Sequence, residues 1–480
     1  MKTFLKRGSK TYKRKQKKNC KKSRKRRVTR GGVQGTQELQ DNLSNMEQRL
    51  LQYLRKICPN SGFCITFGSE NEKIKYFFDG FTNFKYISSP VTLLNSGVSG
   101  FVNEIIFERN GYKVSTILKS SIKNGSDNLF YEAYVGMNYI NLQNRFFPCF
   151  LETYSFFRND EYFWNDMKST KQIGIRGDPN TEINIPSVSV QEFAGFFTKL
   201  DTSLKNINIT CKDAKLNCLL TQYIENPISM LTFLEKEIKQ PNFYVELLQI
   251  LWQVYSVLTS LSVEFTHYDL HYENVLLYTI PENKYMELNY HNYTGFGRNV
   301  IEIPVVKIKT RYIVKIIDYG RCYTPLTEEY YKTICNSENC NKEKILPNGR
   351  VVPCGKYNGY NYFYDKLSER EYYTGSRVRN ISHDLRLVNF FRDPYFLKHA
   401  PENKIFNLIA ANLLYNNPYG TNENTSIEGI TNVISLSRFL IKVVMEEDFV
   451  KKMNSSFEGY EKVGTMNIYL DKSRELEYIV

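Results

Sequence analysis

The residues with the clearest chemical potential lie in one short segment, 266–277, whose sequence is THYDLHYENVLL. Asp269 stands five residues before Asn274, and an apolar, strand-like run follows directly. A carboxylate can accept or orient the proton of a hydroxyl group, and an amide oxygen can bind a metal ion held on nucleotide phosphates. The pair therefore suits phosphoryl transfer, provided that matching groups occur before and after it.

Groups of that kind occur at three separate places. Lys119 ends an apolar, strand-like run, and Glu132 lies within 128–142, whose apolar residues recur with helical spacing. Asp318 ends a second apolar run, 312–317. A lysine can contact phosphate oxygens and a carboxylate can bind Mg²⁺, so the order of these residues matches the requirements of phosphoryl transfer.

The lysine belongs to a predicted β-hairpin. The strands expected at 101–108 and 112–118 flank Asn110 and Gly111, and this dipeptide is a strong hairpin signal. Ahead of the first strand, residues 95–102 read NSGVSGFV. Small residues at the entry of a hairpin let the backbone approach phosphates closely.

The order of these features resembles the eukaryotic-type protein kinases over about residues 90–450. The resemblance implies an α+β, two-lobed fold with a small β-rich N-lobe and a larger, mainly helical C-lobe. Independently of it, Pro241 and the apolar spacing that follows predict a helix over 241–264. It also implies ATP and Mg²⁺ as cofactors. By the same resemblance, the residues that bind the nucleotide are Gly97, Gly100, Val102, Lys119 and Glu132.

The resemblance also assigns the catalytic and metal-binding roles. The catalytic residues are Asp269, Lys119, Asn274 and Asp318, of which Asn274 and Asp318 bind the metal. Asp384 corresponds to an aspartate that steadies the catalytic loop from behind. For Glu132 the alternatives are a solvated helix position, with Glu104 or Glu152 taking its place.

Several departures from the family pattern leave the acceptor open. Asn95 replaces the first glycine, and Tyr268 and His271 replace the usual Arg and Lys of the catalytic segment. The loss of that Arg argues against control by a phosphorylated activation loop. The leading expectation is transfer to Ser and Thr hydroxyls of proteins. The alternatives are an aminoglycoside-phosphotransferase-like small-molecule kinase and a non-catalytic pseudokinase module.

Two further segments resemble a particular group within the protein kinases. Residues 132–136 read EAYVG and residues 147–154 read FPCFLETY, which resembles Ser/Thr protein kinases of giant DNA viruses. That resemblance implies an intracellular location in host cytoplasm, viral factory, nucleus or virion, and not secretion. An N-terminal apolar signal segment and a transmembrane run are both absent from the sequence, so neither export nor a membrane partner is expected.

All of the excess positive charge lies at the N-terminus. Residues 1–30 contain 16 Lys or Arg and no Asp or Glu, whereas the remaining chain has 48 basic and 50 acidic residues. Self-repulsion predicts that residues 1–35 form a disordered basic tail. The tail is either a contact for nucleic acid or another polyanion, a nuclear-localisation signal, or a solvated segment without a dedicated partner.

The rest of the chain is divided by changes in periodicity and by turn residues. An amphipathic helix is expected at 38–57 and short strands at 61–90, which together form an N-terminal extension, 36–89. The N-lobe then covers 90–235 with an insertion at about 155–210. The C-lobe covers 236–480, with insertions at about 280–305 and 321–380 and mainly helices from 382 onward.

The insertion at 321–380 holds a group of cysteines with two interpretations. Cys335, Cys340 and Cys354 could form a zinc site with Cys322 or His383 as the fourth ligand. Their irregular spacing and the absence of a C-x-x-C pair favour free cysteines or a disulfide instead.

Overall fold

The residues that the computed structural model describes lie between 43 and 479. The predicted tail, 1–35, lies outside the described residues. The described ranges are 43–57, 69–82, 86–88, 92–96, 100–121, 126–159, 197–200, 217–293, 305–330, 343–345, 351–353, 362–363, 373–374, 378–399, 404–414 and 429–479.

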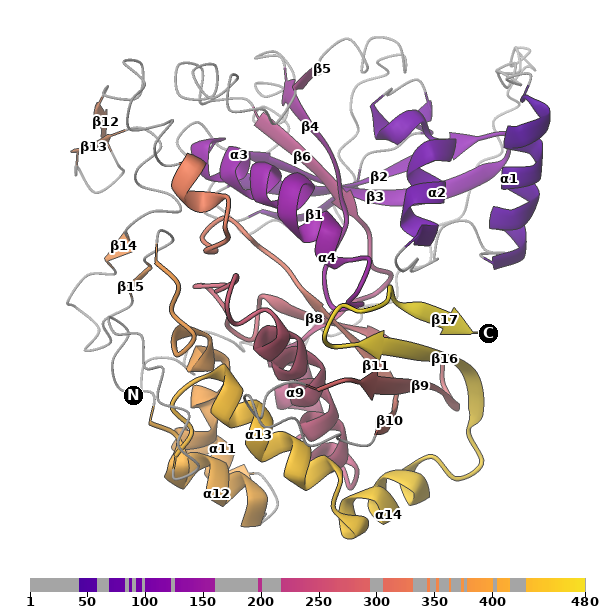
Figure 1. Cartoon of the computed structure of the whole chain (residues 1–480). Coiled ribbons are helices and arrows are strands. Elements are labelled where there is room, and N and C mark those ends of the chain that lie inside the picture. Colours follow the sequence, from indigo (N-terminus) through magenta and orange to yellow (C-terminus); the bar gives the residue numbers. More distant parts are fainter. Residues whose placement is uncertain are drawn as a thin grey trace, which may run out of the picture. The chain divides into compact units, whose positions relative to one another are not determined.

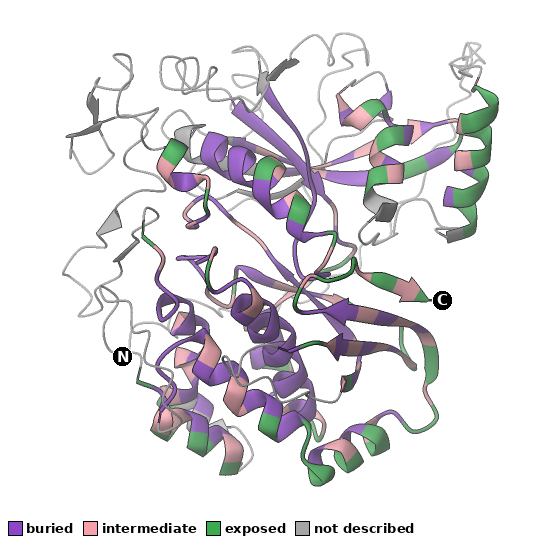
Figure 2. Cartoon of the chain, in the orientation of Figure 1, coloured by how far each residue is buried: buried purple, intermediate pink, exposed green. Residues whose placement is uncertain are grey.

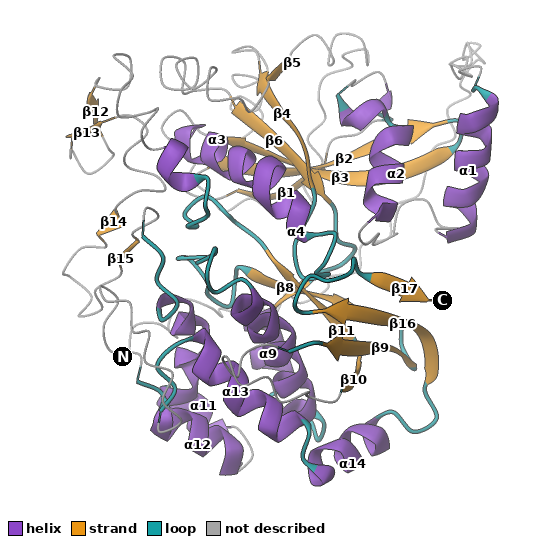
Figure 3. Ribbon diagram, in the orientation of Figure 1, coloured by secondary structure: helices purple, strands orange, loops and turns teal. Residues whose placement is uncertain are grey.

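The fold mixes helices with several sheets, as Figure 3 shows. The largest sheet is antiparallel throughout and has the strand order β1-β2-β3-β6-β4-β5. The predicted hairpin is confirmed, because Asn110 and Gly111 turn between β2 and β3 with positive φ angles of 50° and 71°. The strands are β1 (Thr92–Ser96), β2 (Gly100–Arg109), β3 (Tyr112–Ser121), β4 (Thr153–Asn159), β5 (Phe197–Leu200) and β6 (Asn217–Gln222).

Both faces of this sheet are covered, because successive side chains of a strand point to opposite sides. On β4, Phe156 joins the large hydrophobic core that includes helix α3 (Ser126–Val135), whereas Phe157 joins a second core. On β6, Leu219 and Leu220 divide in the same way. The second core is completed by α1 (Asn45–Ile57), α2 (Ser69–Phe77) and the short helix η1 (Asp79–Phe81), whose buried faces are visible in Figure 2.

The N-terminal extension differs in part from the prediction. The helix expected at 38–57 is present as α1, but the strands expected at 61–90 are wrong over 69–81, where α2 and η1 lie. Their buried side chains are Ile74, Phe77, Phe78 and Phe81, which have the helical spacing i, i+3, i+4, i+7. The aromatic content suggested strands, but the spacing of those aromatics favours a helix.

The helix predicted at 128–142 is present but is not uniform. After α3 it continues as the π-helix η3 (Gly136–Ile140) and one last turn, α4 (Asn141–Gln143). Gly136 faces β4 so closely that a Cβ atom there would lie 2.3 Å from Thr153 Oγ1. The Asn141 amide exchanges hydrogen bonds of 2.7 and 2.8 Å with the backbone of Thr153, which fastens the helix to the sheet.

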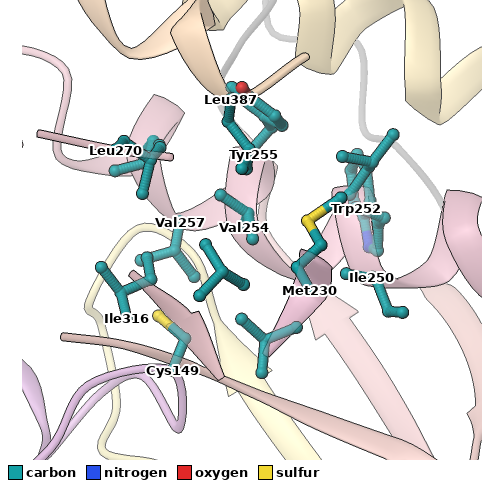
Figure 4. Close-up of a cluster of buried hydrophobic side chains, with 14 of the residues drawn as sticks. Cys149, Met230, Ile250, Trp252, Val254, Tyr255, Val257, Leu270, Ile316 and Leu387 are labelled. Carbon is teal, nitrogen blue, oxygen red and sulfur yellow. The ribbon is translucent and has the colours of Figure 1, made fainter. Parts of the chain in front are cut away.

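The second half of the chain surrounds α9 (Phe243–Ser260), which matches the helix predicted at 241–264. Beside it, β11 (Tyr312–Ile316), β8 (Val275–Thr279) and β7 (Ile228–Ser229) form a three-stranded antiparallel sheet. Figure 4 shows side chains of α9 packed with those of neighbouring segments: Val254, Val257, Leu270, Ile316 and Leu387. The remaining helices are α8 (Met230–Glu237), η7 (His383–Arg392), α11 (Pro394–His399), α12 (Lys404–Asn412), α13 (Val433–Val444) and α14 (Glu447–Ser456).

A further sheet was not foreseen. Its strand order is β10-β9-β16-β17, and β9 pairs in parallel with β16 (Figure 1). β9 lies within 280–305, the stretch predicted as an insertion, and β16 and β17 are strands in the stretch from 382 onward, where mainly helices are predicted. These strands are β9 (Lys284–His291), β10 (Val306–Thr310), β16 (Glu461–Tyr469) and β17 (Glu477–Ile479).

The other predicted insertions lie largely outside the described residues. Within 155–210, the described parts are most of β4 and all of β5, and these residues belong to the large sheet. Within 321–380, two short antiparallel pairs are described: β12 (Glu343–Ile345) with β13 (Val351–Pro353), and β14 (Tyr362–Phe363) with β15 (Tyr373–Thr374). No helix in the described part of the chain is long and apolar enough to cross a membrane.

Candidate functional site

Lys119 and Glu132 form an ion pair. β3 carries the lysine and α3 carries the glutamate, and Lys119 Nζ lies 2.5 Å from Glu132 Oε1. The side chains are 22% and 6% exposed, so Glu132 does not occupy a solvated helix position. Glu152, the substitute considered from the sequence, instead pairs with Lys75 of α2 at 3.2 Å. The structure therefore brings Lys119 to Glu132, as the sequence suggested.

The carboxylates of Glu132 and Asp318 both act on the protonation of Lys119. Burial by itself lowers the pKa of Lys119, but attraction to Glu132 and Asp318 outweighs it and raises the pKa above its usual value. Burial raises the pKa of Glu132, against the opposing attraction of Lys119. The lysine is therefore cationic at neutral pH and lies in the field of both carboxylates.

The glycine segment is only partly described. Gly97 lies outside the described residues, and Gly100 is the first residue of β2, paired with Ser121. Val102 is directly opposite Lys119 in the β2–β3 register and is half-buried. The sheet thus places Val102 beside the lysine.

Asn274 and Asp318 are brought together by the pairing of β8 with β11. In that register Val275 is opposite Ile316, and the next amide, Ile317 N–H, donates to Asn274 O at 3.0 Å. Asn274, just before β8, and Asp318, just after β11, therefore lie at the same end of this pair of strands. The Asn274 Nδ2 group donates to Asp269 O at 2.9 Å, which fixes the amide plane and leaves Oδ1 as the group suited to bind a cation.

Asp318 has an unusual backbone conformation. Its φ angle is 69°, in the left-handed region that non-glycine residues rarely adopt. Tyr268, which directly precedes Asp269, has a φ angle of 61°. Such conformations cost of order 1–3 kcal/mol and persist where the surroundings enforce them, often at functional sites. Tyr268 is next to Asp269 in the sequence, and Asp318 directly follows Ile317, whose amide is hydrogen-bonded to Asn274 O.

Asp269 is held by two arginines that the sequence reading did not single out. Arg386 Nη1 of η7 lies 2.8 Å from Asp269 Oδ1, and Arg321 Nη1 lies 3.2 Å from Oδ2. His271 Nε2 is 3.8 Å from Oδ1, and burial lowers the pKa of His271. Arg321 follows the Asp318-Tyr319-Gly320 motif directly, and this position is the one signal that could have drawn attention to it.

The His267 ring joins the segment that carries Asp269 to the end of β11. Its Nδ1 accepts a hydrogen bond from Asp269 N at 3.3 Å, so the neutral ring carries its proton on Nε2, which donates to Ile317 O at 3.0 Å. Burial lowers the pKa of His267 to about 4, against the attraction of Asp269 and Asp318. The residue is structural and neutral.

Asp384 supports the segment from behind, in the position that the resemblance implied. Its two oxygens accept hydrogen bonds from His267 N at 2.8 Å and from Tyr268 N at 3.0 Å. The Tyr268 ring is buried, and its hydroxyl donates to Val378 O. Burial raises the pKa of Asp384 to about 7, although both backbone donors favour the carboxylate. The pair of bonds holds the backbone on which Asp269 lies.

The low pKa of His267 predicts an acid-dependent loss of stability. Because the folded protein binds fewer protons at this site than the unfolded chain between pH 6.5 and 4, the free energy of unfolding falls as the pH drops through that window. The expected loss is about 3 kcal/mol. Urea denaturation of the wild type and of His267→Gln across pH 4–7.5 measures it as the difference between the two curves.

That difference isolates His267, since Asp384 is present in both proteins. With its pKa raised to about 7, Asp384 acts in the opposite direction, because the folded state then binds more protons than the unfolded state below that pH. The stability advantage of the wild type over His267→Gln should therefore shrink as the pH falls. Two parallel curves would contradict the assignment of a buried neutral histidine.

Asp318 and Asn274 are the residues at this site that could hold a Mg²⁺ ion bound to nucleotide phosphates. Among the described residues there is no group of three or more His, Cys, Asp or Glu side chains arranged around one point. Mg²⁺ on nucleotide phosphates needs only one or two carboxylates from the protein, and Asp318 with the oriented Asn274 amide provides a set of this kind.

The cysteine hypothesis stays untested. Cys335, Cys340 and Cys354 lie outside the described residues. Cys322 is a buried thiol, and burial raises its pKa well above the usual value, while His383 is buried beside Tyr268.

Comparisons with known proteins give no family for this chain. Neither models of protein families nor curated proteins match it significantly.

Proposed function

We propose that this protein transfers the γ-phosphoryl group of ATP to a hydroxyl acceptor in a Mg²⁺-dependent reaction, with Ser and Thr of proteins as the leading acceptors. One observation carries the proposal: the Lys119–Glu132 ion pair lies in the field of Asp318. Phosphoryl transfer depends mainly on positioning and on neutralising charge, and this combination supplies a half-buried cation beside a carboxylate suited to bind a metal.

Each residue has a role that follows from its chemistry. Lys119 contacts the phosphates, and Glu132 holds the lysine side chain in place. Asn274 and Asp318 hold Mg²⁺, which neutralises charge on the phosphate oxygens when it is bound. Asp269 orients the hydroxyl of the acceptor and can accept its proton, while Asp384 and His267 fix the backbone around it.

The arrangement of the chain supports a two-lobed, protein-kinase-like fold. Lys119 and Glu132 come from the large sheet and the helix packed on it, whereas Asp269, Asn274 and Asp318 come from the half around α9. The segment 149–151 connects these parts, since Cys149 O accepts a hydrogen bond of 2.7 Å from Ile316 N. A nucleotide bound between them would contact residues from both.

A small-molecule acceptor is the second candidate. The observation that favours it is His271, which lies 3.8 Å from Asp269, where Ser/Thr protein kinases carry a lysine. A screen of hydroxyl-bearing metabolites and of protein substrates with radiolabelled ATP separates the two. Transfer to metabolites alone would replace the protein-kinase assignment with the small-molecule one.

Calorimetry with Mg·ATP and the full-length protein tests the proposal at its first step. We expect saturable binding that requires Mg²⁺, followed by transfer of label to a hydroxyl acceptor. Absence of nucleotide binding would overturn the proposal. If DNA binding then fell steeply with salt and disappeared on removal of residues 1–30, a non-catalytic module that carries a polyanion-binding tail would take its place.

A further inference from the structure

Two buried tyrosine hydroxyls, which the proposed chemistry does not use, hold the chain around Asp318. The first belongs to Tyr319, the residue directly after the aspartate. Its hydroxyl donates to Ile316 O and accepts a hydrogen bond of 3.1 Å from Leu151 N. One oxygen atom thus ties the turn after β11 both to the end of that strand and to the segment 149–151.

The second hydroxyl belongs to Tyr131, which directly precedes Glu132 on α3. It donates to Cys322 O at 2.6 Å and lies 2.8 Å from Thr327 Oγ1. Thr327 Oγ1 in turn accepts from Thr324 N at 2.9 Å, which closes the turn at 324–327. The helix that carries Glu132 is therefore bonded to the chain four residues beyond Asp318.

A backbone bridge also holds the chain just after Asp318. Thr266 and Tyr323 pair antiparallel, with N–O distances of 3.2 and 2.8 Å. Thr266 immediately precedes His267, so this bridge connects the chain after Asp318 to the segment that carries Asp269. Residues 318–323 are consequently bonded to α3, which carries Glu132, and to the segment that carries Asp269.

We propose that Tyr131 and Tyr319 are positioning residues, whose hydroxyls hold Asp318 in register with Glu132 and Asn274. The inference rests on the proposed function. A phenylalanine at 319 would keep the ring contacts with Phe150 and His267, both with ring centroids 6.2 Å away, but would leave Leu151 N and Ile316 O without this hydroxyl. Burial raises the pKa of both tyrosines well above the usual value, so both stay protonated donors.

The role predicts a particular kinetic defect. In Tyr319→Phe and Tyr131→Phe, Asp318 is held less firmly, so the Mg²⁺ concentration for half-maximal activity should rise about tenfold, consistent with the loss of one buried hydrogen bond. High Mg²⁺ should restore most of the activity. Because both hydroxyls hold one segment, the effects of the double variant should be coupled and not independent.

Tyr293→Phe is the matched control. The Tyr293 hydroxyl is also buried and bonded, to Ser437 Oγ at 2.9 Å, but it joins segments away from the site. This variant should lose a comparable amount of thermal stability and keep the wild-type Mg²⁺ requirement. If Tyr131→Phe fails to fold, Thr327→Val breaks the same hydrogen-bonded chain from its other end.

Hydrogen exchange of the full-length protein without nucleotide gives a readout that does not depend on activity. Amides of residues 316–323 should exchange faster in Tyr319→Phe and Tyr131→Phe than in Tyr293→Phe. If exchange and the Mg²⁺ requirement match the control, the positioning inference is overturned while the proposed function stands. If the wild type does not bind Mg·ATP, the proposed function fails instead and the inference fails with it.

Discussion

Asp269→Asn is expected to slow phosphoryl transfer by roughly 10²–10⁴-fold, the usual contribution of a positioned general base. The asparagine keeps the size of the side chain but can neither take the acceptor proton nor attract Arg386 and Arg321 as an anion. Affinity for Mg·ATP should change little, because Lys119, Asn274 and Asp318 are untouched. Single-turnover transfer and calorimetry on the same preparation measure the two quantities.

The control for this variant is Asp448→Asn, an exposed position in the first turn of α14. It removes the same charge from the molecule and should leave transfer unchanged. Because two arginines lose their anionic partner in Asp269→Asn, its thermal stability needs to be measured alongside. A folded Asp269→Asn protein with wild-type transfer would contradict the assigned role.

Lys119→Met is expected to lower kcat/KM for ATP by about 10²–10³-fold, as found when one preorganised donor to a developing negative charge is removed. Methionine preserves the apolar stem of the side chain but deletes the ammonium group that lies 2.5 Å from Glu132. The change also leaves Glu132 buried without its cation. Initial rates over a range of ATP concentrations measure the effect.

Lys113→Met on the same strand provides the comparison. That lysine is exposed and pairs with Glu108 at 3.2 Å near the hairpin turn, away from the site. Exposed ion pairs of this kind contribute about 0–1 kcal/mol, so the variant should behave like the wild type. Equal losses in the two variants would show that the effect comes from strand β3 in general, and would exclude a special role for Lys119.

The parts of the fold that could be predicted are those with local signals. The Asn110-Gly111 turn, the long stripe of α9 and the apolar runs of β8 and β11 are each encoded within a few consecutive residues. Their order predicts Lys119 on a strand, Glu132 on a helix and Asp318 at the end of a strand, and the structure has them there. The pairing of Lys119 with Glu132 then needed one further assumption, that the helix packs on the sheet.

Contacts between distant segments could not be predicted in the same way. Arg386 reaches Asp269 across 117 residues, and Tyr131 reaches Cys322 across 191. An arginine or a tyrosine has no spacing rule that identifies its partner at such separations, so these side chains look like ordinary core or surface residues. The alternation in β9 was visible in principle, since Met286, Leu288 and Tyr290 are buried at every second position.

The parallel pairing of β9 with β16 joins two strands that are far apart in the sequence and that therefore emerge from the ribosome at different times. β9 is synthesised long before β16, and Glu461 must reach Lys284 before that edge of β9 is covered. Until then a nascent chain on the ribosome carries an open strand edge, which can pair with other chains. Binding of a chaperone to the nascent chain should therefore raise the soluble yield of the protein. Shortened versions that end before β16 should aggregate when they are expressed.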